Sequence, residues 1–217
     1  MSLTMLYDLM IATGETVYMV LISTLFAILL GLPLGTLLFT SKMVKPHPLI
    51  HRLIAGFINI SRSVPFIILL VAIIPLTRLL VGTSIGIHAA MVPLTLGAAP
   101  FFARLVDNVY KSLPQGLIEA GFAMGANTWQ MVRHILFPEA RPALIHAITV
   151  TTITLVNYSA MAGTVGGGGL GDLAIRYGYQ RFNPSVMLAT VAILVVIVQL
   201  LQMGGDRLAR HFSQGVR

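Results

Sequence analysis

The side chains that most often carry out chemistry in proteins are sparse in this sequence. Its 217 residues include six histidines, seven acidic residues and no cysteine, which excludes disulfides and thiol chemistry. The histidines show no close pairing that resembles a metal site, and the acidic residues form no plausible catalytic pair beside a nucleophile motif. We therefore expect a chain that binds no metal, holds no cofactor of its own and is not an enzyme.

One glycine run, V-G-G-G-G-L-G at 165–171, invites comparison with a loop that binds phosphate. The phosphate-binding pattern G-x-x-x-x-G-K-[ST] ends in a lysine and a hydroxyl residue, and both are absent here. We expect this run to be a flexible connector between two apolar segments.

A polar stretch at 118–142 lies between long apolar runs, so we do not read it as a bilayer span. Glu119 and its neighbours favour a short helix, and Gly125 predicts where that helix stops. Two short helices that present Glu119 would form a compact knob suited to a groove on a partner protein. On spacing alone, we favour the alternative of an amphipathic linker that lies at the membrane interface.

A second helix is predicted directly after the stop at Gly125. Asn127 or Thr128 provides an N-cap for a helix at 129–136. We expect this helix to end before Pro138, because proline has no N–H to donate and its ring obstructs the preceding turn.

The composition predicts an all-α integral membrane protein. The chain is 56% hydrophobic and 10% charged with a mean hydropathy of +0.87, which is too apolar for a soluble domain of this length. A helix needs about 20 residues to cross the hydrocarbon core. We expect about five transmembrane helices in one membrane domain spanning 1–217, at 16–40, 53–77, 87–110, 142–163 and 185–204.

The net charge of +7 reflects membrane topology and not nucleic-acid binding. Basic residues concentrate in the connector after the first span, around the polar stretch and in the C-terminal tail, which the positive-inside rule places in the cytoplasm. The other side retains only Arg78, Arg176 and Arg181. We expect an outer N-terminus and a cytoplasmic C-terminus, from the positions of Lys42, Lys45, Arg52, Arg104, Lys111, Arg133, Arg141, Arg207, Arg210 and Arg217.

Arg62 lies well inside the second predicted span, where an arginine costs about 2.5 to 3.5 kcal/mol on insertion scales. Two interpretations are equally open. The side chain reaches the inner boundary and places its guanidinium among lipid headgroups, or it lies inside the assembly, paired with a carboxylate or with helix-end carbonyls.

The fourth span is the most polar, and we expect it to line a path through the membrane. Thr151, Thr154, Tyr158 and Met161 follow helical spacing and could share a face, with Asn157 nearby. Tyr158 and Met161 are the candidates for a gate, because they lie toward the outer end and a thioether is an adaptable apolar plug. The alternative is that these polar groups only bond to other helices.

The order of residues in the polar stretch resembles the EAA loop of permease subunits in ATP-driven (ABC) importers. In that family the loop, here about 112–141, docks on a separate ATPase. The matching positions are Glu119, Ala120, Gly121, Met124, Gly125, Ile135 and Pro138. Two positions depart from the family pattern, because Gly121 replaces the usual alanine and Phe137 the expected leucine. Gly121 should loosen the helix by up to about 1 kcal/mol, so that it relies on its partner for order.

The chain is similar to the D/L-methionine importer permeases, and this resemblance covers nearly its full length. It is carried by S-R-S-V-P-F at 61–66, I-P-L-T-R at 74–78, V-G-T-S-I-G at 81–86 and N-Y-S-A-M-A-G at 157–163. It implies a type I importer fold in a bacterial inner membrane and a homodimeric path. It also implies two ATPase subunits, which hold ATP and Mg, and an extracytoplasmic methionine-binding protein.

Three other functions fit parts of this sequence less well. A permease for another amino acid differs only in its substrate. A proton- or sodium-driven carrier usually places carboxylates or histidine relays within the membrane, and we expect essentially none in these spans. A purely structural anchor would leave the order of the EAA-like residues unexplained.

Overall fold

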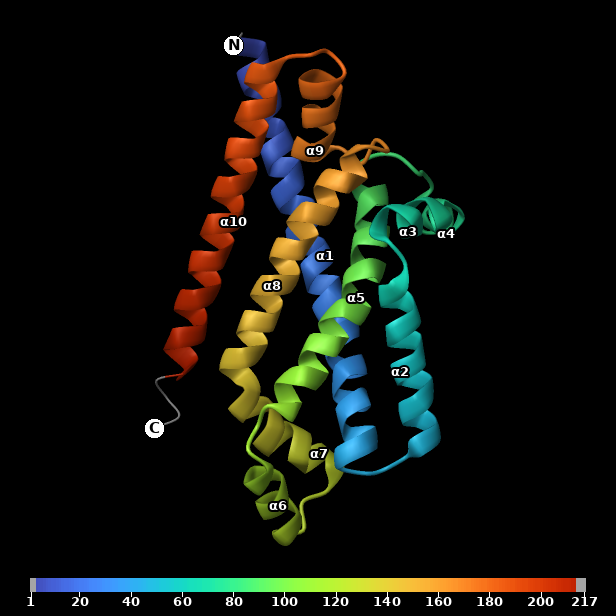
Figure 1. Ribbon diagram of the computed structural model, residues 1–217, viewed down its shortest axis with the longest axis vertical. Coiled ribbons are helices and arrows are strands. Elements are labelled where there is room, and N and C mark those ends of the chain that lie inside the picture. Colours follow the sequence, from blue (N-terminus) through green and yellow to red (C-terminus); the bar gives the residue numbers. More distant parts are fainter. Residues whose placement is uncertain (1–2, 214–217) are drawn as a thin grey trace.

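The computed structural model describes residues 3–213, and every regular element in that range is a helix. The long helices α1 (Leu3–Met43), α5 (Ile87–Lys111), α8 (Phe137–Gly163) and α10 (Pro184–Ser213) run along the long axis of the molecule. Figure 1 shows α6 (Gln115–Ala123) at one end of this bundle and α9 (Gly169–Leu173) at the other. We call these the α6 end and the α9 end.

Length and apolar composition make four helical segments in the described residues long enough to cross a bilayer: α1, α5, α10 and the continuous stretch 128–163 that contains α8. A fifth candidate is the bent pair formed by α2 (Pro48–Ser63) and α3 (Phe66–Ala72). The expected all-α membrane fold with about five spans is therefore confirmed.

The second predicted span, 53–77, was wrong as one continuous helix. The chain breaks between α2 and α3, and the two helices meet at an angle of 100°. Pro65 cannot donate a backbone hydrogen bond and disfavours helical geometry at Val64, which is extended with φ −83° and ψ 124°. The chain then continues into α4 (Ile74–Val81).

The predicted spans 16–40, 142–163 and 185–204 are shorter than the helices that contain them, whereas 87–110 matches α5 closely. The first helix begins at Leu3 and is 41 residues long, and the last continues to Ser213. Hydropathy marks where a helix is apolar, but Asp8 and Glu15 do not end a helix whose hydrogen bonds continue through them.

The core is organised by the close approach of α1 and α5. A Cβ atom added at Gly31 would lie 2.7 Å from the backbone oxygen of Ala99, and one added at Gly35 would lie 2.7 Å from Cβ of Val106. Small residues permit such contact between helix backbones where no water is present to drive association. This packing fixes α5, which leads into the polar stretch.

The glycine run at 165–171 is not the flexible connector that we expected. It leads into α9 and the π-helix η2 (Ala174–Tyr179), and Gly171 is buried so closely that an added Cβ would lie 2.5 Å from Cα of Ala160. Glu15 accepts a 2.8 Å hydrogen bond from the backbone N–H of Gly169. These contacts fix the run between α1 and α8.

Candidate docking knob and translocation face

The polar stretch forms a small helical projection at the α6 end, which we call the knob and define as residues 115–136 (Figure 1). It contains α6, the short helix α7 (Thr128–Gln130) and the π-helix η1 (Met131–Leu136). The expected end of the first helix is confirmed, since α6 ends at Ala123 and Gly125 adopts φ +72°.

The predicted N-cap at Asn127 is also confirmed. Its Oδ1 accepts a 2.9 Å bond from the N–H of Gln130, and Oε1 of Gln130 accepts a 2.9 Å bond from the N–H of Asn127. This reciprocal pair satisfies two donors at the helix start and fixes the turn between α6 and α7.

The second helix does not end before Pro138, so that expectation was wrong. The segment η1 continues directly into α8, and Pro138 lies in the first turn of α8. The N–H of Phe137 bonds to the carbonyl of Val132, five residues earlier. This wider register accommodates a proline that cannot donate, so the knob and α8 form one continuous helical stretch.

The inner side of the knob is packed around Gly121, which is buried. An added Cβ there would lie 2.7 Å from Cε of Met131 and 2.7 Å from Cδ1 of Ile135. Met131 is fully buried, and Ile118 is nearly so. The glycine that replaces the family's usual alanine therefore leaves room for the side chains of η1.

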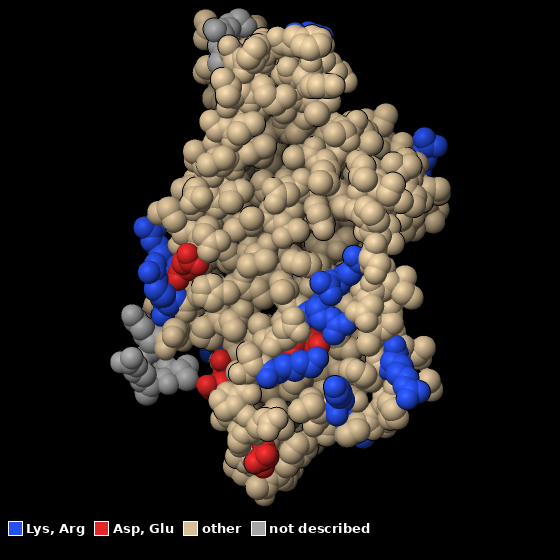
Figure 2. Space-filling model, viewed as in Figure 1, with Lys and Arg blue, Asp and Glu red and all other residues tan. Residues whose placement is uncertain are grey.

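The outer side of the knob is exposed and amphipathic. Glu119 and Ala120 face solvent, and the exposed fractions are 46% for Phe122, 76% for Met124 and 67% for Trp129. Figure 2 shows acidic atoms at this tip, while the basic side chains on this face gather closer to the bundle. Large apolar side chains beside a lone carboxylate are typical of an interface with a protein.

The sequence-predicted docking residues therefore separate into two groups. Four lie on the outer surface of the knob: Glu119, Ala120, Met124 and Gly125. Gly121 and the half-buried Ile135 face the inner side, and Pro138 lies at the base in α8.

An ionic cluster that we did not predict lies beside the knob. Asp107 in α5 is fully buried, and its Oδ2 accepts bonds from Arg104 Nη1 at 3.1 Å and Lys111 Nζ at 2.6 Å. Arg104 also donates to the side-chain oxygen of Asn59 in α2. The expectation of essentially no carboxylate within the spans was wrong here. The spacing 104, 107 and 111 on one helix face was the available signal.

Arg62 lies exposed near the end of α2, and its guanidinium carbon lies 6.0 Å from the centre of the Phe101 ring. That distance is within the range of a cation–π contact. Within residues 3–213 it forms no ion pair, so the carboxylate partner considered from the sequence is not provided by this part of the chain.

Three of the four predicted path residues lie on one open face of α8. Asn157 and Met161 are exposed and Thr154 is half-buried, in line with Val150, which is 47% exposed. We call Val150, Thr154, Asn157 and Met161 the α8 stripe. Tyr158 is set apart, because its ring stacks on Phe66 with centroids 4.3 Å apart.

Most hydroxyl groups near the α8 stripe bond to their own helix. Thr154 donates to the carbonyl of Val150 at 2.8 Å, and Thr151 is buried and donates to Ala147. Thr151 is therefore not on the open face that its spacing suggested. A cross-helix bond does join Thr24 to Thr152 at 3.4 Å, so the alternative of helix-to-helix bonding holds for one of these threonines.

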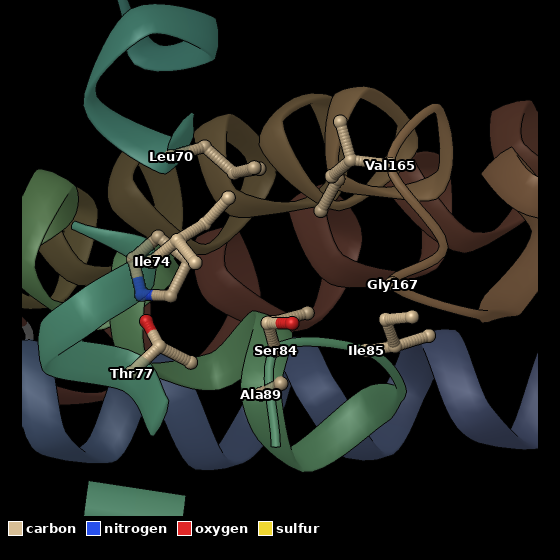
Figure 3. Close-up of a pocket in the computed structure, with 11 residues that line it drawn as sticks. Leu70, Ile74, Thr77, Ser84, Ile85, Ala89, Val165 and Gly167 are labelled. Atoms are coloured by element: carbon tan, nitrogen blue, oxygen red, sulfur yellow. The ribbon is translucent and has the colours of Figure 1, made fainter. Parts of the chain in front are cut away.

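The α9 end contains a cavity of about 100 Å³ (Figure 3). Ile74, Ser84 and Val165 line it from three separate segments, together with mainly aliphatic neighbours. The volume is below the roughly 300 Å³ at which small-molecule sites begin. It is therefore a packing gap where α4, the start of α5 and the end of α8 meet.

A second, polar cavity of about 250 Å³ at the α9 end is lined by Asp8, Glu15, Asp172 and Arg176, among others. Asp172 accepts two hydrogen bonds from the guanidinium of Arg176. These bonds are the main cause that raises the pKa of Arg176 above its usual value, so its guanidinium remains charged.

Residues 27–217 match the family of inner membrane components of binding-protein-dependent transport systems. The chain belongs to this family. The match includes the whole knob and the α8 stripe, and it confirms the resemblance based on the EAA-like residues.

Two relatives are similar to this chain over three quarters or more of its length. A Vibrio cholerae protein described as probable D-methionine transport system permease protein MetI is 51% identical over 206 residues, covering 94% of this chain and 91% of that protein. The D-methionine transport system permease protein MetI of Escherichia coli K12 is 50% identical over 165 residues, covering 75% of this chain and 76% of that one.

Solved structures show the same fold. A chain of the MetNI methionine ABC transporter in an inward facing conformation matches with a TM-score of 0.96 at 48% identity, covering 98% of this chain and 99% of that one. An amino acid ABC transporter crystallised with histidines matches with a TM-score of 0.74 at 18% identity, which shows a shared fold only. The expected fold of an ABC importer permease is thus confirmed.

Proposed function

We propose that this chain is the permease subunit of an ATP-driven importer and that it carries methionine inward through a path formed by two copies of itself. The observation that carries the proposal is the likeness to methionine permeases, at 51% identity over 206 residues and a TM-score of 0.96. This likeness includes both the knob and the α8 stripe, the two parts that a coupled transporter needs.

The outer surface of the knob is the proposed docking site for an ATPase. It presents Glu119 beside Phe122, Met124 and Trp129, an exposed surface that a groove lined with apolar and basic groups would complement. Two such ATPases, one for each copy, would hold ATP and Mg and carry out hydrolysis. This chain supplies the surface on which each ATPase docks.

The continuous helix at 128–163 is the proposed mechanical link between docking and transport. It is 36 residues long, or about 54 Å at 1.5 Å per residue. ATP binding would draw the two ATPases together and move the knobs. Because η1 has no break before α8, that movement would tilt the α8 stripe, opening the path outward, and hydrolysis would reset it.

The α8 stripe is the proposed wall of the path, with Met161 as the candidate gate and Tyr158 supporting it through Phe66. An asparagine and a threonine facing lipid hydrocarbon would be unfavourable, and a second copy across a two-fold axis would cover them. The exposure of Asn157 and Met161 in a single copy supports this arrangement.

The α6 end is the proposed cytoplasmic side of a bacterial inner membrane. Basic side chains gather toward that end on the face shown in Figure 2, as the positive-inside rule expects. The N-terminus is then outside, and the extracytoplasmic methionine-binding protein delivers substrate at the α9 end. Arg217, part of the charge argument, lies outside the described residues.

The test uses liposomes that contain this chain, its cognate ATPase and its binding protein. We expect methionine to stimulate ATP hydrolysis, and Glu119→Lys to abolish both the stimulation and ATPase retention, because the charge reversal falls on the docking surface. His47→Lys adds a lysine to an exposed site in the connector between α1 and α2, outside the knob, and serves as the matched control. Undiminished coupling in Glu119→Lys would refute the docking role. Stimulation by a different amino acid alone would retain the importer and discard methionine as the substrate.

A further inference from the structure

A groove separate from the knob and the α8 stripe lies near the α6 end, between α1, α8 and α10. Its volume is about 410 Å³, within the range of small-molecule sites. Ile28, Ile148, Leu208 and Phe212 are among its lining residues, and Arg141 is the only one among residues 3–213 that is not apolar. We call this space the α10 groove.

The helix register gives the groove a direction. The bond between Thr24 and Thr152 aligns α1 with α8, so Ile28 lies near the level of Ile148, deep in the bundle. Arg141 is seven residues before Ile148 on α8, about 10 Å closer to the α6 end. The groove is therefore apolar within the span and cationic at its α6 end.

The apolar side chains that line the α10 groove are partly exposed, and a lipid acyl chain would cover them. Phe137 and Phe212 are each 40% exposed and Leu208 is 50% exposed, although they belong to helices long enough to cross a bilayer. Within residues 3–213, Arg141 forms no ion pair. A guanidinium at the end of an apolar channel complements a phosphate attached to an acyl chain.

We propose that the α10 groove binds an anionic glycerophospholipid, with one acyl chain along Ile148 and Leu208 and the phosphate at Arg141. Arg207 and Arg210, in the last turns of α10, add positive charge at the same end. This charge favours an anionic over a zwitterionic headgroup. Such a lipid would fill the space between α10 and α1 and hold α10 against α8.

Native mass spectrometry of the assembled transporter tests the site, with phosphatidylglycerol and phosphatidylcholine offered together. We expect selective retention of phosphatidylglycerol, weakened about fivefold by Arg141→Gln, the effect of one arginine near a charged headgroup. Arg52→Gln is the matched control, because Arg52 is exposed at the start of α2 and does not line the groove. Equal retention of the two lipids, or equal losses in the two variants, would overturn the proposal.

A second pair of variants tests the acyl-chain part of the site. Leu208→Trp places a larger side chain in the groove and should displace the lipid, whereas Leu200→Trp changes a residue of α10 that is 63% exposed and outside the groove. Unchanged binding in Leu208→Trp would contradict the proposal.

A cysteine variant tests whether a second copy covers the groove instead. The chain has no cysteine, so a disulfide formed by Leu208→Cys reports only on contact between copies at this position. A disulfide-linked dimer through this position in membranes would show that a second copy covers the groove, and would also overturn the lipid site.

Discussion

Gly121 determines how the knob packs, because the tips of Met131 and Ile135 occupy the volume where a side chain would begin. Its neighbour Glu119, two residues earlier, faces outward. A short helix therefore supplies both the inner packing and the outer surface of the knob. The effect of a substitution at Gly121 therefore depends on the volume available beside Met131 and Ile135 as well as on helix propensity.

Enlarging residue 121 should have graded effects. In Gly121→Ala the ends of the methionine and isoleucine side chains can move aside, and alanine gains up to about 1 kcal/mol of helix propensity, so near-normal coupling is expected. In Gly121→Leu the overpacking should cost about 1 to 3 kcal/mol and detach α6 from η1. Protease accessibility of the knob and ATPase retention would measure both variants. If the leucine variant keeps a protected knob and normal retention, the packing account is wrong.

Single residues differed in how well the sequence alone predicted them. The cap at Asn127 was predictable, because capping depends on groups within three residues. The ionic cluster around Asp107 was only partly readable, since Arg104 and Lys111 are on the same helix but Asn59 comes from α2. The exposure of Asn157 and the stacking of Tyr158 on Phe66 depend on tertiary packing, which no spacing rule specifies.

At the scale of elements, two prolines had opposite outcomes. Pro65 separates α2 from α3 with a 100° bend, whereas Pro138 lies within a continuous helix. Both lack an N–H, but η1 takes a wider register ahead of Pro138 and continues without a break. A sequence shows the local cost of a proline, and the surrounding contacts decide whether the chain bends or continues.

Softening η1 should separate docking from transport. Arg133 and His134 are exposed, so glycine at both removes little packing and costs about 1 kcal/mol each in helix stability. We expect Arg133→Gly with His134→Gly to retain ATPase binding and lose most of the substrate-stimulated hydrolysis. The pair Arg133→Ala and His134→Ala removes the same side chains without softening the helix and should keep coupling. Equal stimulation of ATP hydrolysis in the glycine and alanine variants would show that η1 is not the mechanical link between docking and transport.

At the scale of the whole molecule, composition was sufficient to predict an all-α membrane protein with about five spans. The side chains are apolar enough for lipid, and a helix satisfies the polar backbone N–H and C=O groups within a single segment. Composition was not sufficient to show that the second span is bent, or that the glycine run is packed between α1 and α8. The packing of the glycine run arises from contacts between segments as distant as Glu15 and Gly169.

The open α8 stripe in a single copy and the projecting knob together describe half of a coupled transporter. The most direct test is uptake of labelled methionine into liposomes that contain the assembled transporter, with binding protein on the side of the α9 end and ATP on the side of the α6 end. The proposal predicts ATP-dependent accumulation that unlabelled methionine suppresses and other amino acids do not. Accumulation that is independent of ATP, or that follows a different amino acid, would contradict it.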